Sequence, residues 1–322
     1  MKIGVVGMGS IGRQHVRQLN KLGGVVVHAL RTRRGVPQVL GNEFSQVVEH
    51  ESEEVFFASG LAGVIISNPT HLHVEYALKS VRHGIPVLIE KPVEHTQAGL
   101  ELLKPFAEKI RIAYCLRFHP IIREVKNKLL AKIGRLFKIT FTRGFHLPFW
   151  HPYADYRVEY AAQKAMGGGA SRTLSHEIDL INFYKIGPVV DVSGCIDKIS
   201  NLEIDTDDFA FFSCLLKSGA RANYEIDFLN YNNTNRCTIV GSNGQIDIDL
   251  EEGKVDWTDR SSRKKQVFTH APDEAFDTAY FEQMRDFVIF LREGRSENCT
   301  VAEAYSVIDI IEKVEMNPKF TQ

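Results

Sequence analysis

The sequence has 322 residues, of which 44% are hydrophobic and 25% are charged, and its formal net charge is −1. This composition indicates a globular protein long enough for two domains, and the lack of a basic excess argues against nucleic acid as the main partner. The first apolar run is too short for the core of a signal peptide, and no stretch of about eighteen apolar residues follows. We therefore expect a cytoplasmic protein that does not span a membrane.

The cysteine and histidine patterns predict neither a metal site nor a disulfide framework. The five cysteines are scattered along the chain without CxxC spacing, which fits neither a structural zinc site nor a small disulfide-linked domain. His71 and His73 stand two residues apart at a predicted helix start. Side chains at that spacing point apart, so we expect no metal there.

The first fifteen residues, MKIGVVGMGSIGRQH, predict a strand, a tight turn and the start of a helix that runs to Leu22. Glycine is expected at three positions: at the turn, where backbone approaches a pyrophosphate, and where the helix packs on the strand. The free N–H groups of the first helical turn would face a diphosphate. We therefore predict a dinucleotide site that includes Gly7, Gly9, Ser10, Ile11 and Gly12. A glycine-rich turn in some other α/β protein is the alternative.

Further strand-like runs alternate with helical patterns up to about residue 114. The runs are Val25–Leu30, Gly63–Ser67, Pro86–Ile89 and Arg111–Cys115. This alternation predicts crossover units and a parallel sheet. Ligands of an open parallel sheet gather at the carboxyl ends of its strands, so functional residues are expected directly after each run.

The segment after the second run lacks the acid that NAD-selective folds place there. It begins Arg31-Thr32-Arg33 instead. Arg31 could stack on adenine, while Thr32 and Arg33 could bind a 2′-phosphate. The pattern favours NADP(H), with NAD(H) as the alternative cofactor and a solvated basic turn as the alternative without a ligand.

A second motif follows the strand-like run that ends at Ser67. It consists of Asn68-Pro69-Thr70-His71, with His73 two residues after His71. Pro69 stiffens the turn, and Thr70 or Asn68 could cap a helix that begins near Thr70. The backbone of this segment would lie beside the ribose and nicotinamide of the cofactor.

Glu90-Lys91-Pro92 follow the run that ends at Ile89. A lysine at the carboxyl end of a central strand, next to an acid, could meet cofactor and substrate together. A surface ion pair at a strand end is the alternative.

These three segments, GMGSIG, NPTHLH and EKP, resemble the Gfo/Idh/MocA family. The resemblance implies an NAD(P)-dependent protein with an N-terminal Rossmann domain and an α+β domain for substrate binding and oligomerisation. We expect the first domain to span residues 1–118 and the second to span residues 119–322. That second domain would hold a large, open, mostly antiparallel sheet. The resemblance further implies that Lys91 contacts the nicotinamide ribose and the reacting hydroxyl, and that Glu90 lies in the cofactor pocket.

The segment Tyr114 to Pro120 resembles the family's entry into the second domain, with Cys115 where Asn is more usual. Arg117 and His119 would then lie over the active site, where Arg117 could touch cofactor and both could bind substrate oxygens. Packing between the domains is the alternative.

An aromatic and polar loop follows a strand predicted over Leu136–Phe145. Aromatic faces beside hydroxyl and guanidinium donors are typical of saccharide sites. Trp150, Arg157 and Tyr160 are therefore candidate substrate residues, although aromatic loops also fill domain interfaces.

Three glycines, 167–169, precede a stretch predicted to be helical over Ala170–Ile186. His176 lies in that helix and matches the position of the family's catalytic histidine, where it would act as general acid/base. Asp179 could orient its ring or hold the substrate. A buried structural histidine is the alternative.

One departure from the family pattern affects the substrate prediction. Many family dehydrogenases have Asp three or four residues before the histidine, where this chain has Arg172 and Thr173. Arg172 could oppose protonation of His176 or bind an anionic substrate. This departure favours a sugar acid, a sugar phosphate or a nucleotide sugar.

From Val189 to about Phe268 the chain is predicted to form strands joined by short turns, and hence an antiparallel sheet. The run Phe209-Ala210-Phe211-Phe212 is apolar on both faces, as if helices cover one face and a second subunit the other, so a homodimer or homotetramer is expected. The segment 231–236 is interpreted as a simple loop. Two helices, Ala275–Arg292 and Val301–Val314, end the fold, the second with Thr300 and Glu303 at capping-box spacing.

Together these patterns predict an NAD(P)(H)-dependent oxidoreductase that acts on CH–OH groups of a sugar derivative, with Lys91 and His176 as catalytic residues. Within enzymes, the alternatives are a C=N or C=C reductase and a glycosidase that uses transient oxidation, both of which the resemblance allows. A catalytically silent dinucleotide sensor is the alternative from another class.

Overall fold

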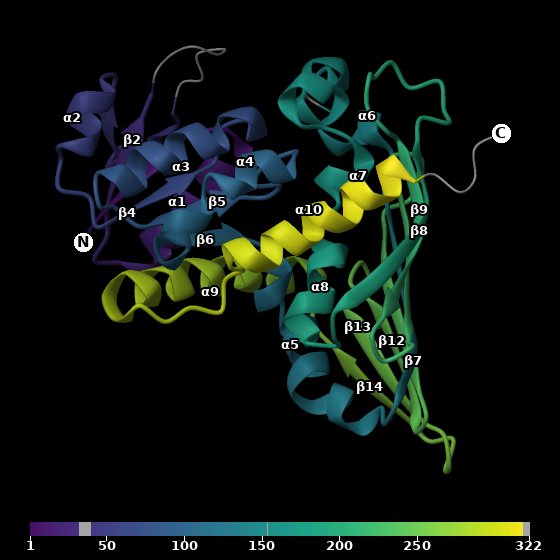
Figure 1. The fold of residues 1–322 in the computed structure, drawn as a ribbon. Coiled ribbons are helices and arrows are strands. Elements are labelled where there is room, and N and C mark those ends of the chain that lie inside the picture. Colours follow the sequence, from purple (N-terminus) through teal and green to yellow (C-terminus); the bar gives the residue numbers. More distant parts are fainter. Residues whose placement is uncertain (32–39, 153, 318–322) are drawn as a thin grey trace. The chain divides into compact units, whose positions relative to one another are not determined.

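The computed structural model describes residues 1–31, 40–152 and 154–317 and is drawn in Figure 1. None of the helices among these residues combines the length and hydrophobicity needed to cross a bilayer. Thr32 and Arg33, two of the predicted cofactor residues, lie outside the described residues.

The chain divides into two compact units. The first contains Met1–Cys115 and also Tyr280–Tyr305, whereas the second contains Leu116–Ala279 and the segment from Ser306 onward. This division differs from a single boundary after Phe118, because a segment near the end of the chain belongs to the first unit.

The first unit is built on a six-stranded parallel sheet in the order β3-β2-β1-β4-β5-β6. The strands are β1 (Lys2–Val6), β2 (Val26–Leu30), β3 (Val48–His50), β4 (Gly63–Ile66), β5 (Val87–Glu90) and β6 (Ile110–Ala113). The parallel Rossmann sheet is thus confirmed. Only β3 was not predicted, because three partly exposed residues carry no hydrophobic pattern. The strand order changes direction between β1 and β4, which is where such sheets bind their ligands.

Short helices connect these strands. They are α1 (Ser10–Leu22), α2 (Glu53–Phe57), α3 (His73–Arg82) and α4 (Gln97–Glu101), with 3-10 turns at 42–44, 70–72 and 104–109. Helix α9 (Pro272–Glu293) completes the core, since Met284 and Phe287 pack with Ile3, Val5 and Val16. The first unit therefore buries side chains from both ends of the sequence.

The second unit is built on an eight-stranded sheet in the order β14-β13-β12-β11-β7-β10-β9-β8. Its strands are β7 (Leu136–Gly144), β8 (Val189–Asp197), β9 (Phe209–Leu216), β10 (Arg221–Asp227), β11 (Thr234–Gly241), β12 (Gly244–Asp249), β13 (Lys254–Asp259) and β14 (Lys265–Thr269). Among the described strands of this sheet, only β7 and β10 pair in parallel, so the mostly antiparallel sheet is confirmed. Part of the expected loop 231–236 is strand, because β11 begins at Thr234 opposite Gly144.

Among the described residues of the second unit, helices cover one face of this sheet and leave the other face open. In Figure 1, α5 (Pro120–Glu124), α7 (Ala170–Thr173) and α8 (His176–Tyr184) lie along one face. On that face the Tyr224 ring stacks 4.6 Å from Phe212 and 5.0 Å from Phe141. On the opposite face, Phe211 is 46% exposed.

Of two predicted helices in the second half of the chain, one is interrupted and one begins where it was expected. The helix expected over Ala170–Ile186 is interrupted at Leu174 (φ −101°, ψ 34°), so it forms α7 and α8 instead of one helix. The helix α10 (Val301–Met316) begins as predicted, because Thr300 Oγ1 accepts from the Glu303 N–H (3.2 Å) and Glu303 Oε2 accepts from the Thr300 N–H (2.8 Å).

Candidate functional site

In the glycine turn after β1, a side chain would fit at one glycine and not at the other two. Gly7 has φ +96°, and a Cβ on Gly12 would lie 2.0 Å from the Gly7 carbonyl oxygen. A Cβ on Gly9 would meet nothing within 4 Å. Gly9 and Ser10 are exposed at the start of α1, and Ile11 is half-buried beside them. These residues fit a diphosphate, because the first-turn N–H groups and the positive end of the helix dipole meet open space.

Arg31 follows β2 and lies beside an acid from the neighbouring strand. Its backbone N–H donates to the His50 carbonyl (2.8 Å), and its Nη1 is 3.4 Å from Glu49 Oε2. Sequence reasoning did not find Glu49, because the acid comes from β3 and not from the end of β2.

The segment after β4 presents a mixture of exposed and buried groups. Pro69 and His71 are exposed, Asn68 is half-buried, and Thr70 is only 3% exposed. The expected cap by Asn68 or Thr70 is wrong, because Pro69 occupies the cap position of a 3-10 turn that precedes α3.

His73 joins the segments that follow β4 and β5. Its ring is 2% exposed, with Nε2 2.7 Å from the Asn68 carbonyl oxygen and Nδ1 3.0 Å from the Pro92 carbonyl oxygen. Burial lowers the pKa of His73. Both ring nitrogens thus meet backbone, which fits a role in positioning the two strand ends.

Glu90 is a buried carboxylate held by two donors. Its Oε1 lies 2.7 Å from His15 Nε2, and its Oε2 accepts from the Lys91 backbone N–H (3.1 Å). The Lys91 side chain is half-buried, and the Lys91–Pro92 peptide bond is cis. Burial raises the pKa of the nearby Cys115 thiol to about 12, so Cys115 is a neutral, buried side chain. His15 was missed by sequence reasoning, although its place on the buried face of α1 marked it as a polar core residue.

In the second unit, the glycine turn before α7 lets its backbone lie close to the Tyr160 carbonyl oxygen and to the Asp207 carboxyl group. A Cβ on Gly168 would lie 2.2 Å from the Tyr160 carbonyl oxygen, and Gly169 has φ +111° with its Cβ position 2.0 Å from Asp207 Oδ1. Asp207 accepts from the Ser171 N–H (2.8 Å), and burial raises its pKa to about 6. This turn leads through α7 to His176, which is half-buried at the first position of α8.

Arg117 and Asp179 pair with each other. Arg117 Nε is 2.7 Å from Asp179 Oδ2 and Nη2 is 2.6 Å from Asp179 Oδ1, and the two residues are 3% and 0% exposed. This two-point ion pair ties α8 to the segment that opens the second unit. The geometry fits a positioning role for both residues.

Two other predicted substrate residues also have surroundings that sequence alone does not reveal. Arg172 Nη1 and Nη2 lie 2.6 Å and 3.0 Å from the carboxylate of Glu315 on α10. His119 is 0% exposed and packs edge-on against Phe276, with ring centroids 4.9 Å apart. Burial and the nearby His270 lower the pKa of His119 to about 4, so its ring is neutral at pH 7.

The predicted aromatic loop forms a cluster beside the glycine turn. The half-buried Trp150 ring lies 5.1 Å from Phe145 and 6.2 Å from Tyr160, the residue whose carbonyl contacts Gly168. Arg157 is instead exposed and pairs with Asp155 (2.8 Å) and Glu203 (3.2 Å).

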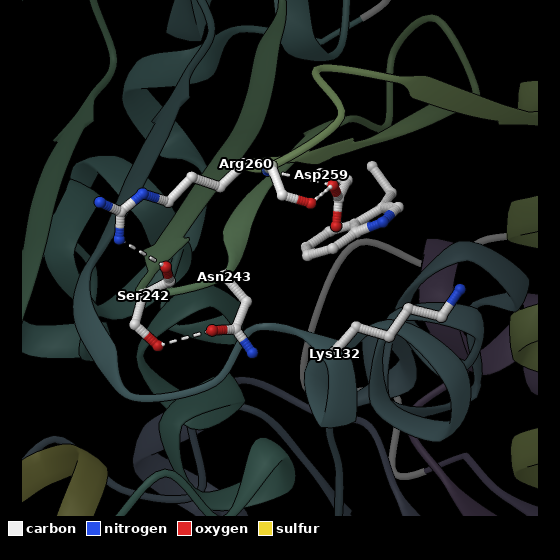
Figure 2. A pocket seen from close by; sticks show the side chains of 7 residues that line it. Lys132, Ser242, Asn243, Asp259 and Arg260 are labelled. Carbon is white, nitrogen blue, oxygen red and sulfur yellow. Dashed lines mark hydrogen bonds between the residues drawn. The ribbon is translucent and has the colours of Figure 1, made fainter.

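A separate cavity of about 560 Å³ lies where the segment before β7 meets the turn between β11 and β12 and the end of β13. Some of its lining residues are labelled in Figure 2. It is lined by Lys132, Ser242, Asn243, Trp257, Asp259, Arg260 and Ser261. Hydrogen bonds from Ser262 and Ser261 hold the pKa of Asp259 at about 2, and Arg260 donates to the Ser242 carbonyl (3.1 Å). No predicted site residue borders this cavity. Within residues 1–31, 40–152 and 154–317, no three His, Cys, Asp or Glu side chains are placed to hold a metal ion.

Comparisons with known proteins agree with both units. Residues 1–115 match the model described as "Oxidoreductase family, NAD-binding Rossmann fold", and residues 125–247 match that of the "GFO/IDH/MocA C-terminal domain". An inositol 2-dehydrogenase from Burkholderia ambifaria (strain MC40-6) is 30% identical over 95% of this chain and 90% of its own length. The chain belongs to the Gfo/Idh/MocA family.

Solved structures extend the likeness of this family member to the whole fold. An oxidoreductase from Agrobacterium radiobacter in complex with NAD+, L-tartaric acid and magnesium has a TM-score of 0.82 at 16% identity, covering 98% of this chain and 95% of that one. A levoglucosan dehydrogenase in complex with NADH also has a TM-score of 0.82, at 18% identity and the same coverages of 98% and 95%. The chain is thus an NAD-binding oxidoreductase by family, with a fold shared along nearly its full length.

The buried Arg117–Asp179 pair generates a stability prediction. Replacing Asp179 with Asn is expected to lower the free energy of unfolding by about 3 to 5 kcal/mol, because the Arg117 guanidinium stays buried beside a neutral amide. Urea unfolding followed by circular dichroism measures the change. Asp155→Asn, which breaks an exposed pair with Arg157, is the control and should leave stability almost unchanged. Equal unfolding midpoints for both variants would contradict a positioning role for the buried pair.

Proposed function

We propose that this chain is an NAD(P)(H)-dependent dehydrogenase or reductase that acts on a hydroxyl or keto carbon of a sugar derivative, in the cytoplasm. The proposal rests on one observation in particular: each unit of this family member carries a half-buried side chain that can donate or accept a proton. Lys91 follows β5 beside the buried Glu90, and His176 opens α8 after the glycine turn.

When bound, the nicotinamide supplies the hydride acceptor or donor. Lys91 would then donate a hydrogen bond to the reacting oxygen of the substrate, which favours the alkoxide character that develops as hydride leaves carbon. His176 would accept the hydroxyl proton as general base, and would return it in the reduction. Glu90 would fix Lys91 through the Lys91 backbone N–H, and Arg117 with Asp179 would fix the start of α8.

The substrate side is supported by the aromatic cluster. Trp150 and Tyr160 lie next to the glycine turn and could pack against the C–H faces of a sugar ring. The relatives named above act, by name, on inositol and levoglucosan. We therefore place the substrate among sugar derivatives, including sugar acids, sugar phosphates and nucleotide sugars. The pairing of Arg172 with Glu315 weakens the argument that Arg172 binds an anionic group.

Removal of the proposed acid/base tests the mechanism. His176→Ala is expected to reduce turnover by about 10²-fold or more, with nearly unchanged affinity for NADPH, because only the proton transfer is lost. Lys91→Met should reduce turnover similarly. The assay follows nicotinamide absorbance with a panel of cyclitols, sugars, sugar acids, sugar phosphates and nucleotide sugars. His83→Ala, on an exposed helix end, is the control. Full turnover by His176→Ala would refute the assignment, whereas tight NADPH binding without turnover by the natural chain would favour a sensor.

We further propose that NADP(H) is the preferred cofactor, with Arg31 stacked on the adenine and Thr32 and Arg33 at the 2′-phosphate. Glu49 opposes this preference, because its carboxylate lies beside Arg31 and would repel a phosphate.

The opposite charges of Arg31 and Glu49 make the cofactor preference testable. Fluorescence titrations should give a lower dissociation constant for NADPH than for NADH, and Glu49→Gln should increase that preference by roughly tenfold, equivalent to about 1.4 kcal/mol. Glu54→Gln, which removes an exposed charge from α2, is the control. Tighter binding of NADH by the natural chain would overturn the NADP(H) preference.

We also propose that a second copy of the chain covers the open face of the eight-stranded sheet, in a homodimer or a homotetramer. The outward side chains of β9 include Phe209, Phe211 and Leu215, and apolar residues on an open sheet face favour association.

Charge on the open face should prevent this association. Phe211→Lys is expected to yield monomers in sedimentation velocity, because two copies would bury the added charge. Ser218→Lys, in the turn between β9 and β10, should keep the mass of the natural protein. A natural chain that sediments as a monomer at micromolar concentration would exclude the proposed oligomer.

A further inference from the structure

Three aromatic side chains gather outside the Trp150 cluster, and no proposed role includes them. We call His146, Phe149 and Tyr231 the outer aromatic cluster. The His146 ring lies 4.7 Å from both Phe149 and Tyr231, and the Phe149 and Tyr231 rings are 6.2 Å apart. Phe149 is 61% exposed and Tyr231 is 74% exposed. A lone exposed aromatic ring is ordinary, but contiguous rings exposed to this degree indicate a binding surface.

The cluster is built from two separate segments that the sheet brings together. His146 and Phe149 belong to the start of α6 (Leu147–Trp150), after β7, whereas Tyr231 follows β10, the parallel neighbour of β7. The Leu147 N–H donates to the Phe228 carbonyl (3.1 Å), which joins the segments. Asp227 then accepts from the N–H groups of Leu229 (2.7 Å) and Asn230 (2.9 Å) and shapes the turn that presents Tyr231. The two segments that carry the rings are therefore joined by a backbone hydrogen bond.

The outer aromatic cluster adjoins the proposed substrate residues along the chain. Phe149 and Trp150 are neighbours on α6, and Trp150 contacts Tyr160, whose carbonyl oxygen packs against Gly168. The glycine turn then leads through α7 to His176. A ligand that packs on Trp150 would thus have Phe149, the preceding residue of the same helical turn, as its neighbour.

The charges in this region indicate what kind of group the outer cluster accepts. The arginines there are already paired, Arg157 with Asp155 and Glu203, and Arg143 with Glu251. The His151 Nδ1 lies 2.7 Å from the Glu159 carboxyl group. The polar groups beside Tyr231 are instead the exposed amides of Asn232 and Asn233. Aromatic faces with neutral amide donors and acceptors suit an uncharged sugar ring better than a diphosphate.

From these observations we propose that the outer aromatic cluster is a subsite for a second, uncharged sugar ring, joined by a glycosidic bond to the ring that is oxidised. The proposal rests on the proposed function, because it extends the substrate of that same site. It names Tyr231 and Phe149 as determinants of substrate size, with no part in proton or hydride transfer.

Ligand-detected saturation-transfer NMR on the full chain with NADPH tests the subsite without requiring turnover. The probes are glucose, maltose, cellobiose and UDP-glucose. At least one disaccharide is expected to bind roughly tenfold more tightly than glucose, and the double variant Phe149→Ala/Tyr231→Ala should remove that gain. Phe137→Ala is the matched control, since Phe137 is 46% exposed at the other end of β7.

Several results would overturn the subsite. Equal binding of glucose and both disaccharides, or no binding of any probe, would do so. Tighter binding of UDP-glucose that depends on Tyr231 would replace the sugar ring with a nucleoside. A lower sedimentation coefficient for the double variant would make the cluster a subunit interface. Turnover of monosaccharides by the double variant at the natural rate separates these failures from a failure of the proposed function, in which no substrate of the panel is oxidised.

Discussion

The buried carboxylate of Glu90 is the interaction on which the first unit's functional edge depends. A carboxylate that is 7% exposed needs compensating donors, and here they come from His15 on α1 and from the Lys91 backbone. The same charge thus fixes the helix that begins at the glycine turn and the strand end that carries Lys91. His73 adds a second connection, because its ring lies between the carbonyl oxygens of Asn68 and Pro92 and in its neutral form donates to one of them. The strand ends proposed to surround the cofactor are therefore held by buried polar contacts and not by loop packing alone.

In the second unit, the position of His176 depends on a break between two helices, α7 and α8. A continuous helix over the predicted range would place His176 in its middle, with its ring constrained by neighbouring turns. The interruption at Leu174 makes His176 the first residue of α8, and the Arg117–Asp179 pair anchors that helix one turn later. The glycines before α7 allow the chain to approach the Tyr160 carbonyl and the Asp207 carboxylate. The proposed acid/base residue and the ion pair that holds its helix are thus distinct residues, one turn apart.

Local patterns predicted most of the architecture. The strand, glycine turn and helix at the N-terminus, the parallel sheet and the capping box at Thr300 all follow from short-range rules of periodicity and backbone geometry. The parts that could not be predicted depend on partners distant in sequence. Glu49 beside Arg31 and Glu315 beside Arg172 are examples, because neither acid has a local signal that names its partner. The break at Leu174 was missed for a similar reason, since its sequence is compatible with a helix and tertiary packing decides otherwise.

The arrangement of α9 has a consequence for how the protein is made. Met284 and Phe287 fill the core of the first unit, and a Cβ on Gly63 in β4 would collide with Phe287 and Leu291. During synthesis the ribosome delivers the six strands long before it delivers this helix. The N-terminal sheet must therefore wait, with part of its apolar surface uncovered, until residues 272–293 have emerged. A gene fragment that ends at the close of β6 would encode the nucleotide-binding strands without the helix that seals them, so the two units cannot be exchanged between proteins by a single cut.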